Sequence, residues 1–277
     1  MGSPELRPAL IYTDAKLHAN GRAFGLVPNG TFGRKISKRY FMTTQLEDVV
    51  SENINSLLGN KTTIKLLEAG CGSATHIRFN QNVHSVGIDI SKEQLDRNTV
   101  IQEKILGDIQ TYPLPEDEFD IVICWEVLEH LPRPKEALQN MFKAVKPDGL
   151  VILAFPNLIS FKGLATKYTP HWFHQFAYRL MKYKSRPFPT YFRLAIIPNR
   201  VRGFAEAHGL SEVSCNLSEG RFQRRVRDRF RSVDWIFAAV NGLVRVASFG
   251  RCPSLYHDAC YLILKKKDKR LSETAGK

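Results

Sequence analysis

Short apolar runs alternate with amphipathic segments from Ile64 onward, and this alternation is the clearest pattern in the chain. Runs of strand length occupy residues 64–68, 83–90, 104–109, 119–127 and 150–157. The fourth run is apolar over most of its length, as is typical of a strand buried on both faces of a sheet. Strands that alternate with helices in this way predict a parallel sheet with helices on both sides.

The segments between and after these runs carry further helix and strand signals. They predict helices at residues 91–98, 134–145 and 199–209, and two final strands at 211–217 and 259–267. Ser91 is placed to cap the start of the first helix, and Gly209 closes the third. The sequence KPDG at residues 146–149 is a stop signal for the second helix.

Two long insertions, here called the cap segments, interrupt the pattern at residues 157–198 and 221–255. The first contains ten aromatic residues and no acidic one, which makes it too apolar for a linker. We therefore expect the cap segments to pack over the carboxyl edge of the sheet. This packing is expected to bury large side chains such as Trp172, Trp235 and Ile236.

The second cap segment contains an apolar stretch at residues 233–249 that carries few polar residues. Asn241 and Arg245 follow Asp234 by seven and eleven residues, so a helix places all three in one narrow stripe. One interpretation is a helix buried in the protein or at a dimer interface. The other is a helix that lies on a membrane surface beside the arginine-rich run at residues 221–231.

The chain of 277 residues is long enough to fold as one large domain without metal or disulfide support. We assign residues 62–277 to that domain and residues 1–61 to a lid segment over its ligand site. The five cysteines are scattered and form no CxxC pair, which argues against a disulfide framework and a structural zinc site. Without an apolar signal-peptide core or a run of about 18 apolar residues, the expected location is cytoplasmic.

The formal net charge of +13 is unevenly distributed along the chain. Residues 62–155 contain 9 basic and 14 acidic residues, a net charge of −5, so the remainder carries +18. The run at residues 221–231 alone contains six arginines. Basic flanks of this kind favour contact with the phosphates of nucleic acid or of lipid headgroups, and they also serve as solvated surface.

The strongest chemical signal is the glycine-containing turn LLEAGCGSAT at residues 66–75, together with Asp89 at the end of the next run. Gly70 and Gly72 allow a tight strand-to-helix turn that a ligand can approach closely. A carboxylate at the end of the second strand is placed to accept hydrogen bonds from ribose hydroxyls. This combination predicts a cofactor that contains adenosine.

The charge of the turn narrows the choice of cofactor. The turn begins with Glu68 and lacks the third glycine of a dinucleotide fingerprint. A pyrophosphate beside an acidic residue would be repelled, whereas a cofactor with a positive centre and no phosphate would be attracted. S-adenosyl-L-methionine, with its sulfonium and ammonium groups, has this chemistry.

The same residues carry a resemblance to a known family. The matching segments are EAGCG (68–72), GIDIS (87–91), GDI (107–109), FDIVICWEVLEHL (119–131), KPDGLVILAFPN (146–157) and FAEAHGL (204–210). With them the chain resembles the class I S-adenosylmethionine-dependent methyltransferases, closely over residues 62–157 and loosely over 199–267. The EVLEH segment is similar to that of the ubiquinone-pathway O-methyltransferases. Ala74 is a departure, because many members have a glycine there.

The resemblance implies a fold and a set of cofactor contacts. The fold is α/β, with a doubly wound seven-stranded sheet whose last strand is antiparallel. The implied cofactor-binding residues are Glu68, Gly70, Cys71 and Gly72 for the methionine portion, Asp89 for the ribose, Asp108 and Ile109 for the adenine, and Trp125 beside the sulfonium, with Ile90 as a further cofactor contact.

The segment WEVLEHLP after the fourth strand leaves three interpretations open. In one, its acids fix the loop geometry and His130 is a hydrogen-bonding support. In another, His130 is the general base and Glu126 assists it, since histidine exchanges protons near neutral pH. In the third, Glu126, Glu129 and His130 bind Mg²⁺ together with a later histidine, His171 or His174, because this segment resembles the E-x-x-E-H pattern of small-RNA 3′-end 2′-O-methyltransferases. We expect no resident metal; these residues are its ligands if one binds.

The aromatic first cap segment indicates the acceptor. His171, Trp172 and His174 lie in its central stretch and are the expected substrate contacts. The leading hypothesis is O-methylation of a hydroxyl on an aromatic or lipophilic small molecule, with an anionic membrane surface as a second partner. The alternatives are an RNA 2′-O or base methyltransferase and a cofactor-binding fold that transfers no methyl group. Nucleic acid is the weaker partner, because no separate RNA-binding module is visible.

Overall fold

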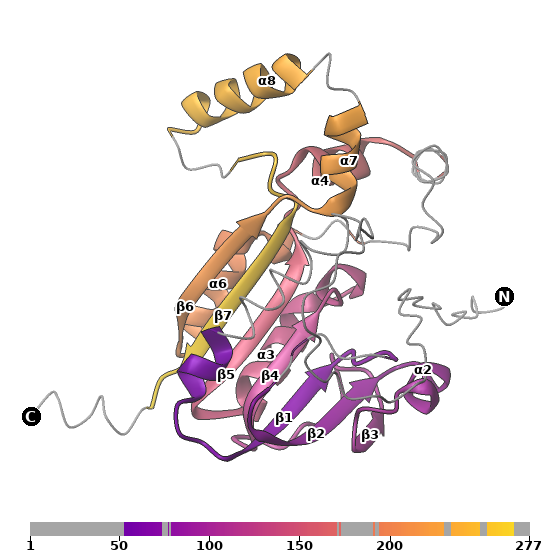
Figure 1. Cartoon of the computed structure of the whole chain (residues 1–277), viewed down its shortest axis with the longest axis vertical. Coiled ribbons are helices and arrows are strands. Elements are labelled where there is room, and N and C mark those ends of the chain that lie inside the picture. Colours follow the sequence, from indigo (N-terminus) through magenta and orange to yellow (C-terminus); the bar gives the residue numbers. More distant parts are fainter. Residues whose placement is uncertain are drawn as a thin grey trace, which may run out of the picture.

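A seven-stranded sheet forms the centre of the protein in the computed structural model (Figure 1). The structure describes residues 53–73, 77, 79–170, 172, 191, 194–229, 234–249 and 254–268. The strands are β1 (Thr63–Ala69), β2 (Asn82–Asp89), β3 (Glu103–Leu106), β4 (Phe119–Trp125), β5 (Val145–Pro156), β6 (Leu210–Ser218) and β7 (Ala259–Lys266). Their order across the sheet is β3-β2-β1-β4-β5-β7-β6.

The direction of the strands agrees with the expected fold. Strands β1 to β5 pair in parallel, whereas β7 runs antiparallel to both of its neighbours, β5 and β6. The α/β fold with an antiparallel last strand is therefore confirmed. The parallel strands end at one common edge, and open α/β sheets bind their ligands at that edge.

The helices predicted at residues 91–98, 134–145 and 199–209, and the helix in the apolar stretch 233–249, are present, whereas those at Phe161–Tyr168, Arg221–Arg229 and residues 53–58 were not predicted. The helices of the structure are α2 (Lys92–Arg97), α3 (Pro134–Ala144), α4 (Phe161–Tyr168), α6 (Pro198–Ala207), α7 (Arg221–Arg229) and α8 (Asp234–Ala247), with helical residues at 53–58 and 3₁₀ turns at Leu128–His130 and Leu194–Ile196. The side chain of Ser91 accepts the backbone N–H of Gln94, which confirms it as the cap of α2. Gly209 follows α6 with a φ of 81°, as a helix-closing glycine does.

The start of β5 differs from the prediction. The helix α3 ends at Ala144, and the KPDG residues 146–149 belong to β5 instead of separating helix from strand. Val145 already pairs with Phe119, and a register shift follows between Phe119 and Ile121. An irregular strand therefore takes over directly from the helix, with Asp148 at a φ of 62°.

Helices cover both faces of the sheet, and a separate hydrophobic core lies on each face. Leu138 and Met141 of α3 and Val201 of α6 are fully buried against one face. Ile54, from the helical residues 53–58, is fully buried against the other face. These residues pack on the sheet, while the rest of the lid segment expected at residues 1–61 lies largely outside the described part of the chain.

The described parts of the two cap segments pack on each other at the carboxyl end of β5 (Figure 1). The Phe161 ring of α4 meets the Phe237 ring of α8 edge-on, with 5.1 Å between centroids. The backbone N–H of Lys162 donates to the Gln223 Oε1 of α7 at 3.1 Å. These two contacts join helices of the first cap segment to helices of the second.

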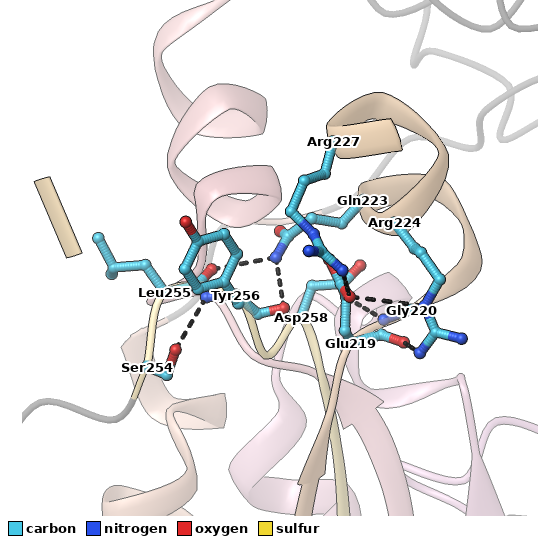
Figure 2. A network of polar contacts seen from close by, with 9 residues as sticks. All are labelled: Glu219, Gly220, Gln223, Arg224, Arg227, Ser254, Leu255, Tyr256 and Asp258. Atoms are coloured by element: carbon cyan, nitrogen blue, oxygen red, sulfur yellow. Dashed lines mark hydrogen bonds and ion pairs between the residues drawn. The ribbon is translucent and has the colours of Figure 1, made fainter. Parts of the chain in front are cut away.

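A polar network fixes α7 to the residues that lead into β7 (Figure 2). The Gln223 carboxamide, 6% exposed, donates to the carbonyl oxygens of Leu255 and Tyr256. The Arg227 guanidinium donates to both carboxylate oxygens of Glu219, at 2.9 and 2.8 Å. Bidentate pairs of this kind hold both partners in a defined orientation.

The expected burial of three large cap side chains is wrong. Trp172 is 68% exposed, Trp235 is 70% exposed and Ile236 is 43% exposed. The cap does pack, but it does so through Phe161, Phe237 and the polar network. No helix among the described residues is long and apolar enough to cross a membrane.

Two glycine-to-alanine substitutions test how the first turn is built. Gly70 has a φ of 71°, and a Cβ there would lie 2.4 Å from the Val127 side chain. Gly70→Ala should therefore lower the free energy of unfolding by roughly 1–2 kcal/mol for the left-handed backbone alone, with the clash in addition. Urea denaturation measures this loss.

Gly203→Ala is the matched control, because this glycine lies inside α6 and its Cβ would meet nothing within 4 Å. Its alanine variant should be more stable than the wild type by about 0.5–1 kcal/mol. Equal effects of the two substitutions would contradict the strained turn.

Candidate cofactor-binding and active site

The candidate site lies where the turn after β1 meets the segment after β4. The left-handed Gly70 and the side chain of Val127 are in such close contact that no side chain larger than hydrogen fits at position 70. The carboxyl end of β2 borders the same turn, because Glu68 pairs with Gly87 and Ala69 with Ile88. Segments far apart in the sequence therefore form one site, as the motif spacing predicts.

The backbone N–H groups of the glycine turn are already used within the protein. Those of Gly70 and Cys71 donate to the Ile88 carbonyl oxygen, at 2.8 and 3.2 Å. The N–H of Gly72 donates to Asp89 Oδ2 at 2.9 Å. A phosphate-binding turn must instead point such groups at its ligand. This turn is therefore built for a ligand without phosphates at this position.

Asp89 retains hydrogen-bonding capacity for a ligand. Its side chain is only 5% exposed, and its two oxygens accept one backbone N–H each, from Gly72 at 2.9 Å and from Ser91 at 2.8 Å. A carboxylate has about four lone-pair sites, so both oxygens can accept a further hydrogen bond. A pair of ribose hydroxyls supplies two such donors.

Asn98 holds the turn from behind, and the sequence interpretation missed it. This fully buried side chain donates to the carbonyl oxygens of Gly72 at 3.1 Å and Cys71 at 3.4 Å. Its own oxygen accepts the N–H groups of Val100 and Ile101. An asparagine directly after a short helix was the only sequence signal for this role.

The predicted cofactor residues beyond Asp89 include an exposed apolar side chain and a carboxylate that is held by hydrogen bonds. Ile90 is 70% exposed, so an apolar surface is presented beside Asp89. The Gln110 carboxamide donates to both oxygens of Asp108 and fixes this carboxylate. Asn140 of α3 donates to the carbonyl oxygens of Ile109 at 2.9 Å and Tyr112 at 2.7 Å. Gln110 and Asn140 are two further supports that the sequence alone did not reveal.

The EVLEH segment forms the opposite side of the site. Glu126 is exposed and has a φ of 54°, a left-handed backbone that costs a non-glycine residue free energy. Its N–H donates to the Ala154 carbonyl oxygen at 2.8 Å, which holds this conformation. His130 Nε2 lies 3.9 Å from Glu129 Oε1. The backbone N–H of Tyr191 donates to the Glu129 carbonyl oxygen, so the first cap segment returns to this point.

Glu129 is a buried acid in an unfavourable environment. Its side chain is 6% exposed, and its Oε2 has no hydrogen-bond partner among the described residues. Burial and the nearby charge of Glu126 raise the pKa of Glu129 from its ordinary 4.5 to about 8. At neutral pH this side chain is mostly protonated and neutral.

The remaining predicted residues have mixed outcomes. Cys71 is buried, and burial together with Asp89 and Glu68 raises the pKa of its thiol to about 12, so it contributes its backbone and not a thiolate. Trp125 is 8% exposed and packs on Tyr261, with 5.3 Å between ring centroids. Its ring is part of the core, and its contact with a cofactor stays a prediction.

The expected substrate and metal residues are only partly within the described structure. Trp172 is described and exposed, whereas His171 and His174 lie outside the described residues. The described residues contain no group of three or more His, Cys, Asp or Glu side chains arranged to hold a metal ion. The alternative metal set around Glu126 and Glu129 includes one of those two histidines, and it stays a prediction.

The residues present fit S-adenosylmethionine. The site contains the buried acids Glu68 and Asp89, and Asp108 and Glu126 border it. This acidic environment attracts sulfonium and ammonium groups and repels a pyrophosphate. The N–H groups of Gly70, Cys71 and Gly72 already donate to acceptors within the protein, which also favours a cofactor without a phosphate at this position.

Comparison with known proteins gives a family match. A family profile described as "Methyltransferase domain" matches residues 42–192, more than half of the chain. An uncharacterised protein of Methanocaldococcus jannaschii is 30% identical over 114 residues, which are 40% of this chain and 50% of that protein. A ubiquinone biosynthesis O-methyltransferase of Actinobacillus pleuropneumoniae is 26% identical over 148 residues, 47% of this chain and 58% of that enzyme. The chain thus spans about half the length of these relatives.

A solved structure shares the fold. It is phosphoethanolamine N-methyltransferase 2 of Haemonchus contortus, in complex with phosphomonomethylethanolamine and S-adenosylhomocysteine. The TM-score is 0.50 at 14% sequence identity, and the match covers 81% of this chain and 53% of that chain. At this identity the likeness extends to the fold alone.

The raised pKa of Glu129 predicts a pH-dependent stability. The folded protein keeps this proton up to pH about 8, whereas the unfolded chain releases it near 4.5. The contribution is therefore fully present below pH 4.5 and is lost as the pH rises through 8, by up to about 1.4 kcal/mol per pH unit. Glu129→Gln should remove this slope when urea unfolding is followed from pH 5 to 9.

Glu126→Gln supplies the second arm of this experiment. It removes the neighbouring charge, so the Glu129 pKa should fall and the slope should end at a lower pH. Identical pH profiles for the wild type and Glu129→Gln would show that this acid is ionised in the folded protein.

Proposed function

Since the chain belongs to the class I S-adenosylmethionine-dependent methyltransferases, we propose that it methylates a hydroxyl oxygen on an aromatic or lipophilic small molecule. The cofactor assignment rests on the glycine turn, whose N–H groups donate to the Ile88 carbonyl oxygen and the Asp89 carboxylate. The observation that supports the acceptor half is the position of His130 directly beyond β4.

The cofactor's two ends would be held by different parts of the chain. Glu68 and the backbone of the turn offer negative potential for the methionine ammonium and the sulfonium. Asp89 offers its two remaining acceptor positions to the ribose hydroxyls, and Ile90 offers an apolar surface to the adenine. When bound, S-adenosylmethionine supplies a methyl group that is already activated by the positive sulfur.

His130 would take the proton from the acceptor hydroxyl. Its side chain is 30% exposed, so an acceptor can reach it from the carboxyl edge of the sheet. Its neighbour Glu129 is mostly neutral at pH 7 and adds no second negative charge beside the base. A positioned base typically accelerates proton transfer by roughly 10²–10⁴-fold. The remaining acceleration would come from alignment of the acceptor and exclusion of water.

The cap segments and the relatives support this proposed acceptor class. The described part of the cap is rich in aromatic side chains, and Tyr191 connects it to the segment that contains His130. Several curated relatives are ubiquinone biosynthesis O-methyltransferases. A phenol with an alkyl or isoprenoid tail is therefore the first acceptor to test.

Calorimetry tests the cofactor assignment. The protein should bind S-adenosylmethionine and S-adenosylhomocysteine, and Asp89→Ala should weaken both by about tenfold or more, because two charge-assisted hydrogen bonds are lost. Asp96→Ala is the control, since this acid is exposed on α2 and pairs only with Lys92 in the described structure. Binding of NADH in place of S-adenosylmethionine would overturn the assignment.

Steady-state kinetics with the phenol test the role of His130. His130→Ala should lower kcat by about 10²-fold or more and leave cofactor affinity unchanged, because a base acts on the acceptor. His84→Ala is the control, as this histidine pairs with Glu103 on the surface.

Unchanged turnover in His130→Ala would return this residue to a supporting role. Loss of activity in EDTA and recovery with Mg²⁺ would favour the metal interpretation. Methylation of RNA in place of the phenol, or binding without any transfer, would replace the proposed acceptor.

A further inference from the structure

We propose that α8 binds the protein to an anionic lipid surface through its outward apolar face. This docking surface does not depend on the proposed reaction. The helix α8 is strongly apolar and yet contains no buried residue.

The helix turns Asp234 and Asn241 of its polar stripe toward the protein, whereas Arg245 is exposed. Its half-buried residues are Asp234, Phe237, Asn241, Val244 and, just after its end, Ser248, which recur at the spacing of one helix face. Asn241 Oδ1 accepts the Leu255 backbone N–H at 2.8 Å and the Ser254 hydroxyl at 3.4 Å. Together with the Phe161–Phe237 contact, these bonds fix the rotation of the helix.

The opposite face of α8 is apolar and exposed. Its members are Trp235 (70% exposed), Ile236 (43%), Val240 (40%), Leu243 (71%) and Val246 (77%), followed by Phe249 (87%) just after the helix. In Figure 1 the helix lies at the end of the molecule that is farthest from β1 to β3. Exposed apolar patches of this kind mark interaction surfaces in soluble proteins.

The positive charges around this face favour an anionic lipid surface as the partner. In the sequence, α7 and α8 together carry six arginines and two acids, Asp228 and Asp234. Arg229 and Arg245 are exposed, whereas Arg227 is engaged by Glu219. Lipid phosphates match both the positive charge and the apolar face. A second copy would bring the same arginines against one another, and RNA offers no apolar layer to cover the helix.

Two exposed aromatic residues of the first cap segment are also compatible with a lipid partner. Tyr168, at the end of α4, is 74% exposed, and Trp172 follows it at 68% exposed. Tyr and Trp combine an apolar ring with a polar tip, which suits the headgroup level of a bilayer. With 14 residues, α8 is too short to span a bilayer and would lie in its surface.

Vesicle flotation tests the proposal with the full chain. The wild type should float with vesicles of phosphatidylcholine and phosphatidylglycerol, more weakly with phosphatidylcholine alone, and less as salt is raised. The double variant Leu243→Ser/Val246→Ser should bind the mixed vesicles at least about tenfold more weakly, because it removes apolar surface from the outward face.

The control is Val213→Ser, which removes an exposed apolar side chain from β6 (41% exposed) and should float like the wild type. A third variant, Arg229→Gln/Arg245→Gln, should lose the preference for the anionic lipid while keeping weak binding. S-adenosylmethionine affinity, measured by calorimetry, should be the same in all variants, which separates this test from that of the reaction.

Equal flotation of the wild type and the Leu243/Val246 double variant would overturn the proposal. So would a wild-type dimer that this variant converts to a monomer without any effect of vesicles, because the face would then bind a second copy. Salt-sensitive RNA binding in the absence of flotation would likewise assign the arginines to nucleic acid.

Discussion

The hydrogen bonds between the glycine turn and the end of β2 determine what the site can bind. Asp89 accepts the Gly72 N–H, and the Ile88 carbonyl oxygen accepts those of Gly70 and Cys71. These three N–H groups are therefore not directed at a ligand, and the buried Asp89 carboxylate keeps capacity for further hydrogen bonds. The acidic surroundings, the left-handed glycines and the supporting Asn98 all serve the same geometry.

The opposite side of the site is maintained at a cost in stability. Glu126 is held in a left-handed conformation, and Glu129 is buried with its pKa raised to about 8. Strained backbone and buried acids of this kind persist where the surrounding structure over-determines them, and they gather at functional sites. His130 follows Glu129 in this segment, and the backbone N–H of Tyr191, from the first cap segment, donates to the Glu129 carbonyl oxygen.

Features that act within one helix could be predicted from the sequence, whereas contacts between distant segments could not. Ser91 and Gly209 act on their own helices, so their roles were predictable, as was the order of the strands along the chain. The buried support by Asn98 depends on a residue 26 positions away, and a short polar residue after a helix gives no sign of it. The rotation of α8 was equally hidden, because Asn241 meets a backbone N–H from another segment. Burial predicted from hydrophobicity alone was therefore wrong for Trp235.

The proposed function requires Asp89 and His130 to lie on two sides of one methyl-transfer site. A crystal structure with S-adenosylhomocysteine and a tailed phenol tests it most directly. We expect both ribose hydroxyls to donate to the Asp89 carboxylate and the phenol oxygen to lie within hydrogen-bonding distance of His130. A nucleoside bound away from Asp89, or a phenol oxygen directed away from His130, would contradict it.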